Sequence, residues 1–441
     1  MSSLNIGYRH ILPVLPFAFV LAGQYGRSLT QSRPRKIACR SVGLAHRRVA
    51  VVYPDYLTYF NETVGGARGG KRLPGRSDLE WGQDLPRLRA YLAENEISEV
   101  FLSYFGTTPP EHYGIRYRPL PAWPPRGIPG QLAYHPDYPL PGVYAISAAN
   151  LVGARFEDAP GTFAWFKLQE PLAVIGNSIY LYRVPRLLDV AALPVNVVLA
   201  GLNLADLPTA VIENDLHTND LIPRWMDASQ ALIFPQGQMV LVMDEETAVH
   251  PLLAERLVTL LPMAEQMTSG DGTQQIQYFD ADLDVALAEY LQANVGKVVY
   301  VSSSPAATLE EVTLMDAPVD FGTAVTFLGY EQVTNPIKPG GVVQLLSYWR
   351  VNELVDAPLA TFVHLLAPDG SVLAQVDGLG VATQYWHPGD IIVQAHQFQA
   401  PDPLPEGMGW LALGLYRSDT LTRLPVNDMF DRILIVVDAT Q

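Results

Sequence analysis

The 441-residue chain has a single cysteine, Cys39, and few charged residues. One cysteine cannot form a disulfide within the chain, and it excludes a zinc site built from several thiolates. Charged residues make up 17% of the sequence, and acidic residues outnumber basic ones by 45 to 29. The net charge of −16 argues against a nucleic-acid partner, because phosphate binding needs a basic face.

The sequence also lacks an apolar run long enough to cross a bilayer, which takes about 20 residues. The longest such run, Ile11–Gly23, is too short, and seven basic residues follow it between Arg27 and Arg48. We expect residues 1–50 to be a short membrane segment followed by a basic linker. A secretory signal is the alternative, with Arg9 and His10 as its charged region, but no clear small-residue cleavage site follows the apolar run.

Hydrophobic periodicity predicts an α/β plus all-β fold. Residues 51–186 and 187–306 alternate strand patterns with helix patterns, which predicts two α/β domains, the first containing a helix near Asp84–Asn95. Residues 307–441 alternate apolar and polar positions between Pro-Gly and Asp-Gly turns, which predicts an antiparallel β-sandwich. The proline-rich stretch 117–130 is predicted to have no regular structure.

Three patterns resemble ligand sites, and each has a simpler explanation. "GGARGGKR" (65–72) matches a phosphate-binding loop until Arg72, where Ser or Thr should hold magnesium, so we interpret it as a flexible loop. "DADLD" (280–284) has oxygen ligands for a divalent cation, but an acidic helix start explains it equally well. Three scattered histidines lack the acidic neighbours that a metal site would need, so no metal is expected: His364, His387 and His396.

The densest polar and aromatic cluster lies in "SDLEWGQDLPRL". Carboxylates that accept hydrogen bonds from hydroxyls, beside an aromatic ring that stacks on a sugar face, are typical of carbohydrate sites. The candidate sugar-binding residues are Asp78, Glu80, Trp81, Gln83 and Asp84. The alternative is a helix N-terminal cap beside a core tryptophan.

Several stretches together resemble bacterial lipid-carrier-dependent glycosyltransferases of the protein O-mannosyltransferase type (family 39, GT-C fold). They cover about residues 4–184 in this order: "NIGYRHILPVLPFAFVLAG", "YPDYLTYFNETVGG", "SDLEWGQDLPRLRAYL", "FLSYFGTTPPEHYGI", "GVYAISAANLVG" and "PLAVIGNSIYLYRV". The strands after Val319 look like the β-domain appended to some members.

This resemblance implies a many-helix membrane enzyme that transfers sugar from a polyprenyl-phosphate carrier to a glycan or protein acceptor, without a cofactor. The family's catalytic carboxylate lies in a first extracytoplasmic loop that this chain does not match, so no catalytic residue is assigned. Arg9 matches an arginine that faces the lipid phosphate, with His10 in place of the family's aromatic residue. An arginine that only extends toward the membrane interface is the alternative.

Two departures bear on this resemblance. The basic stretch Gln24–Ala50 replaces an apolar family helix, which a frameshift would explain, and Arg76, Asp78 and Glu80 replace Asp, Asn and Asp of the family pattern. Residues 1–50 would then be the remnant of a membrane helix.

We therefore expect the extracytoplasmic C-terminal region of such an enzyme at the cell membrane, inactive alone. The alternative is a stand-alone exported glycan-binding or scaffold protein, whose β-sandwich would expose aromatic side chains: Tyr348, Trp349, Tyr385 and Trp386.

Overall fold

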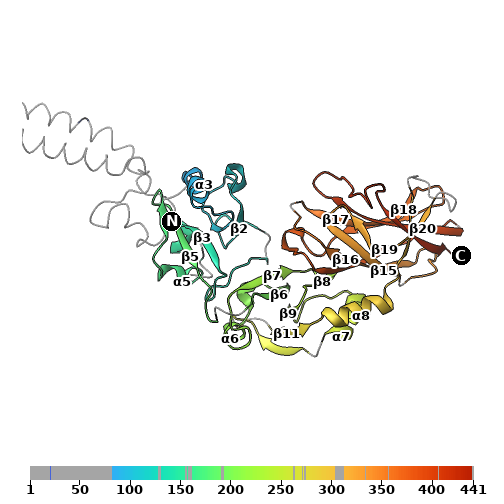
Figure 1. The fold of residues 1–441 in the computed structure, drawn as a ribbon, viewed down its shortest axis with the longest axis horizontal. Coiled ribbons are helices and arrows are strands. Elements are labelled where there is room, and N and C mark those ends of the chain that lie inside the picture. Colours follow the sequence, from blue (N-terminus) through green and yellow to red (C-terminus); the bar gives the residue numbers. More distant parts are fainter. Residues whose placement is uncertain are drawn as a thin grey trace, which may run out of the picture. The chain divides into compact units, whose positions relative to one another are not determined.

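The computed structural model describes Val20 and residues 82–127, 131–153, 156, 161–189, 193–261, 264–270, 272, 275–302, 312–332, 334–355, 357–405 and 407–439. The chain divides into two compact units, Met1–Leu187 (unit 1) and Leu188–Gln441 (unit 2). Figure 1 shows that β-strands form most of the regular structure in the described residues. Among those residues, no helix has the length and apolar character needed to span a bilayer.

Unit 1 is built on a five-stranded mixed sheet with the order β2-β1-β3-β5-β4. Strand β1 is parallel to both β2 and β3, whereas β5 is antiparallel to β3 and to β4. The elements of this unit are α3 (Leu85–Glu94), β1 (Val100–Ser103), η6 (Pro110–Tyr113), β2 (Tyr117–Pro119), β3 (Gly142–Ser147), α4 (Ala148–Val152), α5 (Ala164–Lys167), β4 (Ala173–Ile175) and β5 (Ile179–Val184).

Both faces of this sheet are covered. Helix α3 buries Leu85, Leu88 and Leu92, spaced three and four apart on one side, against one face of the sheet. On the opposite face, Tyr144 of β3 and Tyr182 of β5 contact the ring of Phe166 from α5, at centroid distances of 4.9 and 5.2 Å. The helix expected near residues 84–95 is therefore present as α3.

One expectation for unit 1 was wrong. The proline-rich stretch 117–130 contains strand β2, which pairs in parallel with β1. Proline cannot donate to a sheet ladder, but β2 is the edge strand, where Pro119 needs no partner on its outer side.

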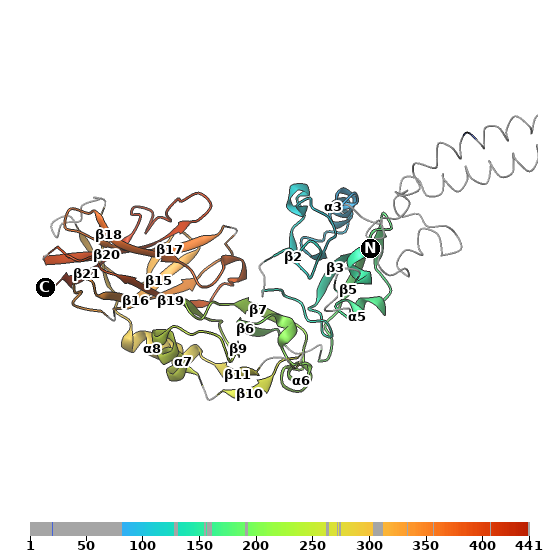
Figure 2. The same ribbon diagram turned by 180° about the vertical axis from the view of Figure 1, so that it is seen from behind.

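Unit 2 begins with a second mixed sheet, ordered β10-β11-β9-β6-β7, in which β6 is parallel to both neighbours. Its strands are β6 (Val195–Ala200), β7 (Leu221–Trp225), β9 (Gln238–Asp244), β10 (Glu265–Thr268) and β11 (Gln275–Asp282). Short helical segments follow β6: η7 (Leu204–Asp206), α6 (Thr209–Val211) and η8 (Ile212–Leu216). Helices α7 (Pro251–Leu260) and α8 (Asp284–Asn294) lie side by side (Figure 2).

The rest of unit 2 consists of two antiparallel sheets. The five-stranded sheet is ordered β14-β15-β16-β19-β8 and contains β8 (Ala231–Phe234), β14 (Val319–Phe321), β15 (Val325–Gln332), β16 (Val342–Val351) and β19 (Ile391–Gln399). The six-stranded sheet is ordered β13-β12-β21-β20-β17-β18 and contains β12 (Val298–Val301), β13 (Thr313–Asp316), β17 (Leu359–Leu366), β18 (Val372–Gly378), β20 (Gly407–Arg417) and β21 (Ile433–Ala439). A short turn, η9 (Thr383–Tyr385), precedes β19.

One hydrophobic core joins all three sheets of unit 2. It includes Leu241 of the mixed sheet, Leu345 and Val393 of the five-stranded sheet, and Val363 and Leu413 of the six-stranded sheet. Strand β8 pairs with β19, and β12 pairs with β21. The segment 187–306 thus supplies strands to the sheets of 307–441, within one compact unit.

Candidate functional site at the carboxyl edge of the unit 1 sheet

The structure describes two of the six residues predicted to bind the sugar or its lipid carrier. Arg9, Asp78, Glu80 and Trp81 lie outside the described residues. Gln83 is exposed and Asp84 is buried, and they lie directly before α3. The predicted sugar site can therefore be followed only where its motif enters the fold.

Asp84 lies at the carboxyl edge of the parallel strands. Its Oδ2 accepts a hydrogen bond of 2.6 Å from the hydroxyl of Ser178, 94 residues away. The backbone of Ser178 in turn accepts from the Ala148 amide at 2.7 Å, directly after β3 ends. In α/β folds this edge is where ligand sites commonly form, so we take it as the candidate site.

Three protein side chains donate to the carboxylate of Asp84. Arg87 donates to Oδ1 at 3.0 Å, and Gln83 donates to Oδ2 at 3.3 Å, beside the bond from Ser178. The residue is only 2% exposed. Burial keeps the hydroxyls of a sugar away from this carboxylate, so the geometry gives Asp84 a structural role.

The backbone beside Asp84 is shaped to admit this carboxylate. Gly176, in the turn between β4 and β5, has φ +55°, and a Cβ there would lie 2.1 Å from Oδ1 of Asp84. Only glycine fits both the left-handed conformation and the close approach. The stretch "VIGNS" is therefore part of the same arrangement as "GQDLP".

A second polar contact ties together the ends of the parallel strands. The side-chain amide of Asn150 in α4 donates to Oγ of Ser103 at 3.0 Å, and Ser103 donates to the Pro121 carbonyl at 2.6 Å. Ser103 and Asn150 are completely buried. The analysis of the sequence missed this pair; small polar residues at the ends of apolar strands were the available signal.

Arg126 fastens the loop that follows β1. Its Nη2 donates to the carbonyl of Gly106 at 2.6 Å, and its guanidinium lies 4.9 Å from the ring centroid of Tyr104. Nearby, burial and a 2.8 Å hydrogen bond to Glu111 raise the pKa of Tyr117 to about 12. This loop is thus held by a cation, while the tyrosine stays neutral near pH 7.

The aromatic residues proposed for glycan binding are mostly in the core of unit 2. Tyr348, Trp349 and Trp386 are buried, and Tyr385 is half-buried. Trp349 contacts the rings of Phe321 and Phe327 edge-on, at 5.1 and 5.0 Å. The exposed aromatic platform that the glycan-binding alternative requires is absent at these positions. Tyr348 and Trp349 are neighbours in β16 and face opposite sides of it, and both sides are covered: Tyr348 donates to Glu331, and Trp349 packs on Phe321 and Phe327.

The other candidate ligands are separated or already bonded. Asp280 accepts from Gln238 at 3.1 Å, and Asp284 accepts from the Gly237 amide at 2.9 Å. His396 bonds to Ser347 at 2.8 Å, and burial lowers the pKa of His396 to about 3. Across the described ranges, His, Cys, Asp and Glu do not gather into any group of three suited to a metal ion. The phosphate-loop-like stretch 65–72 lies outside those ranges.

Unit 2 has one buried and one partly buried polar cluster. Arg224 of β7 forms a two-bond ion pair with Asp390, at 2.7 and 2.8 Å. Glu331 of β15 accepts from Arg256 of α7 at 2.7 Å, from Tyr290 of α8 at 2.8 Å, and from Tyr348. Burial and this carboxylate raise the pKa of Tyr290 to about 12. These clusters attach helices and sheets to one another.

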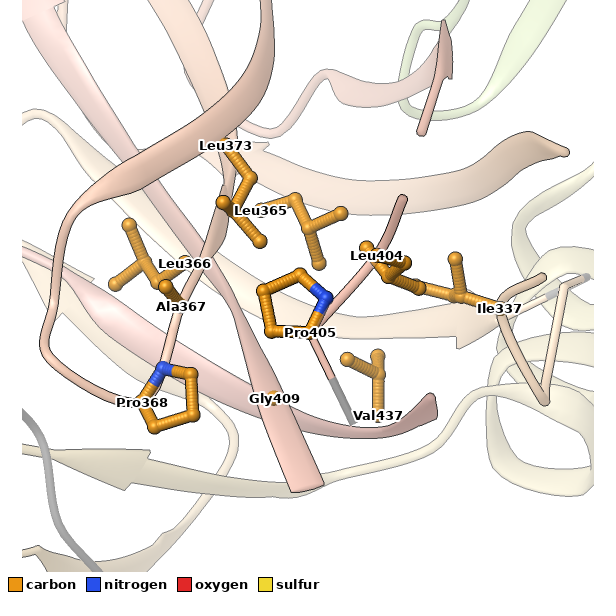
Figure 3. Close-up of a pocket in the computed structure, with 10 residues that line it drawn as sticks. All are labelled: Ile337, Leu365, Leu366, Ala367, Pro368, Leu373, Leu404, Pro405, Gly409 and Val437. Atoms are coloured by element: carbon orange, nitrogen blue, oxygen red, sulfur yellow. The ribbon is translucent and has the colours of Figure 1, made fainter. Parts of the chain in front are cut away.

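A small pocket at one end of the antiparallel sheets is shown in Figure 3. Aliphatic side chains, prolines and one glycine line it, among them Leu365, Leu404 and Pro405. The cavity volume open to water is only about 10 Å³, which is room for about one water molecule. A pit of this size without side-chain polar groups cannot orient a ligand.

Comparisons with known proteins assign no family. No protein-family model and no curated protein matches the chain. Among solved structures, the C-terminal domain of wzt is 14% identical over 28% of this chain and 77% of its own, with a TM-score of 0.22. A CARDB domain from Pyrococcus furiosus is 12% identical over 25% of this chain and 90% of its own, with a TM-score of 0.18. Such values carry neither a fold assignment nor a function to this chain.

Proposed function

We propose that this chain is the extracytoplasmic C-terminal region of a membrane glycosyltransferase that uses a polyprenyl-phosphate sugar, and that this region is not itself catalytic. The resemblance described above is the starting point. On this proposal, the two units position a glycan or protein acceptor, or a partner, at the outer face of the cell membrane.

The observation that carries the proposal is the convergence of four resembling stretches on one edge of a sheet. "SDLEWGQDLPRLRAYL" supplies Asp84, and "PLAVIGNSIYLYRV" supplies Ser178, its partner. "FLSYFGTTPPEHYGI" supplies Ser103, and "GVYAISAANLVG" supplies Asn150, its partner. Stretches that share an order along the chain also share contacts, which is what a common structural unit requires.

The state of the carboxylate supports a non-catalytic role. A general acid or base must reach the reacting group within hydrogen-bond distance. Asp84 is sealed beneath Ser178 and Arg87. Its bonds suit an anchor for α3 better than an acid or base.

We propose that the two antiparallel sheets of unit 2 form a β-sandwich with a supporting role. The buried Tyr348, Trp349 and Trp386 favour this over a glycan-gripping module. Sugar-dependent tryptophan fluorescence of the purified chain would speak for glycan binding instead.

The proposal is tested by incubating the purified chain with a radiolabelled polyprenyl-phosphate sugar and candidate acceptors. We expect no transfer above the level without protein. Turnover that depends on the chain would contradict the proposal. Sequencing the locus upstream of Met1 and across codons 20–52, in all frames, gives the second readout. Apolar helices and an acidic first loop are expected there, whereas a promoter and ribosome-binding site immediately upstream would indicate a stand-alone protein.

A further inference from the structure

The hydroxyl of Tyr278 in β11 is buried, and no described protein group forms a hydrogen bond with it. The residue as a whole is only 5% exposed. A buried polar group normally bonds to protein, to ordered water or to a ligand, because an unmet hydrogen bond costs stability. The charges around this hydroxyl indicate which kind of group it suits.

Four carboxylates share the face of the mixed sheet on which Tyr278 lies. Tyr278 is paired with Glu265 on the neighbouring strand β10 (Figure 2), and the two residues of such a pair point to the same side. Asp280 and Asp282 follow at steps of two along β11, and the register of β9 places Asp244 on the same face. Every acidic residue of the five strands therefore lies on this face.

Three carboxylates lie near enough for their charge to act on the hydroxyl. Asp215 of η8 joins Asp280 and Glu265 there. Burial, and then the charges of Asp280, Asp215 and Glu265, raise the pKa of Tyr278, so the phenol keeps its proton. All three carboxylates are exposed. We call Asp215, Glu265, Tyr278 and Asp280 the Tyr278 site.

Basic side chains are scarce around the Tyr278 site. The five strands contain one basic residue, Arg224, which lies on the opposite face of the sheet and pairs with Asp390. The segment 201–220, which carries Asp215, contains no lysine or arginine. Asp280 accepts a hydrogen bond of 3.1 Å from the neutral amide of Gln238. The strands and this segment thus leave the negative charge of the face without a cation of their own.

The arrangement favours a guanidinium over a metal ion. Across the described ranges, acidic side chains do not gather in threes closely enough to hold a metal ion. A guanidinium has five N–H donors in a planar fork, so it can bond to separate carboxylates at once. It can also donate to the phenol oxygen of Tyr278, whose own proton can go to a neighbouring carboxylate.

We propose that the Tyr278 site binds an arginine side chain from a basic segment of a partner protein. The carboxylates of Asp215, Glu265 and Asp280 accept from its guanidinium, and Tyr278 completes the set of acceptors. A second copy of unit 2 is a poorer occupant. Residues 188–441 contain 8 basic and 32 acidic side chains, so their net charge is 8 − 32 = −24 and two copies repel. This inference goes beyond the proposed function and does not depend on it, because it concerns unit 2 alone.

The experiment measures binding of a fluorescein-labelled peptide of alternating arginine and alanine to the full chain, by fluorescence anisotropy at low salt. Tyr278→Phe removes only the hydroxyl. It should weaken peptide binding about threefold and leave the thermal unfolding midpoint unchanged, because no described protein group loses a bond. Asp215→Asn/Asp280→Asn should weaken binding about tenfold. The matched control, Glu289→Gln/Asp428→Asn, removes two exposed carboxylates elsewhere in unit 2 and should change binding less than about twofold.

The same peptide with lysine in place of arginine should bind more weakly, because an ammonium lacks the planar fork. Equal binding of the two peptides, or an equal loss in the control variant, would overturn the proposal in favour of unspecific charge attraction. A lower unfolding midpoint for Tyr278→Phe would overturn it by giving the hydroxyl a structural role. Self-association of the chain that the arginine peptide reverses would overturn the choice of partner and assign the site to a second copy.

Discussion

Among the described residues, each unit buries one carboxylate that joins segments far apart in the sequence, but the two carboxylates are neutralised differently. In unit 2, Asp390 pairs with Arg224, and both side chains are 3% exposed or less. In unit 1, Asp84 relies on the Ser178 hydroxyl and on Arg87, whose side chain is 42% exposed. Water therefore screens the charge of Arg87 in unit 1 but not that of Arg224 in unit 2. Equal burial of two carboxylates therefore does not mean equal dependence on their cations.

The first test of this comparison removes the buried cation. Arg224→Met should lower the free energy of unfolding of unit 2 by about 3–5 kcal/mol, because Asp390 is left buried and unpaired. Urea unfolding followed by tryptophan fluorescence measures the loss. The double variant Arg224→Met/Asp390→Leu should recover most of it, because neither charge remains. A loss below about 1 kcal/mol in the single variant would show that water reaches Asp390.

The second test uses pH and concerns unit 2. Burial lowers the pKa of His396 to about 3, while the unfolded residue titrates near 6.5. Above pH 6.5 the imidazole is neutral in both the folded and the unfolded state, so the free energy of unfolding does not change with its titration. As the pH falls below 6.5 only the unfolded state gains a proton, so about 3 kcal/mol should be lost by pH 4.

Urea unfolding at several pH values measures this slope. NMR titration of the imidazole gives an independent check, in which the ring should stay neutral until the protein unfolds. An imidazole that titrates near pH 6.5 in the folded protein would contradict the prediction.

In unit 1, the carboxylate should matter more than its surface cation. Asp84→Ala strands the buried Ser178 hydroxyl and frees the start of α3, which should cost about 2 kcal/mol. Arg87→Ala should cost less than about 1 kcal/mol, because its ion pair is partly solvated. Thermal unfolding of both variants gives the ratio, and equal losses would remove the distinction drawn between the units.

The smallest effect separates backbone strain from crowding. Gly176 and Gly322 have nearly the same φ, +55° and +57°, but only Gly176 faces a neighbour, the Asp84 carboxylate, within 4 Å. Alanine at either position should cost about 1 kcal/mol for the left-handed backbone. Gly176→Ala should cost about 1 kcal/mol more, because its Cβ displaces Asp84. Equal costs would mean that the turn at Gly176 shifts away from Asp84 without a further loss of stability.

The local sequence pattern predicted the helices and strands better than it predicted which of them pair with one another. The leucine spacing gave α3, and the alternation after Val319 gave β15–β21, because burial of one face fixes periodicity. Strand β7 was missed because Pro223 and Arg224 break its apolar run, and the partner that makes Arg224 acceptable lies 166 residues away. Their apolar runs predict that β8 and β12 are strands, but they do not predict which sheet each strand joins.

The candidate site shows the same limit. The sequence placed Asp84 at a helix start, and it does occupy that position, but its side chain makes no cap bond to the helix backbone. It bonds to Ser178 instead, a contact set by how β5 returns beside β3. Spacing within "GQDLP" holds no information about that return. The glycan-binding alternative placed Tyr348 and Trp349 on the surface, but these neighbours lie on opposite faces of β16 and both are buried. Alternation gives the two faces of a strand but does not show that both faces are covered.

Strands β8 and β12 come before residue 307 but join the sheets of later residues, and this has a consequence for truncated forms of the chain. A fragment of residues 307–441 would lose β8 and β12, which pair with β19 and β21. Two long strands would then present open, apolar edges, and such edges recruit other chains. That fragment should aggregate where residues 188–441 stay in solution. The natural point of division lies ahead of the second mixed sheet.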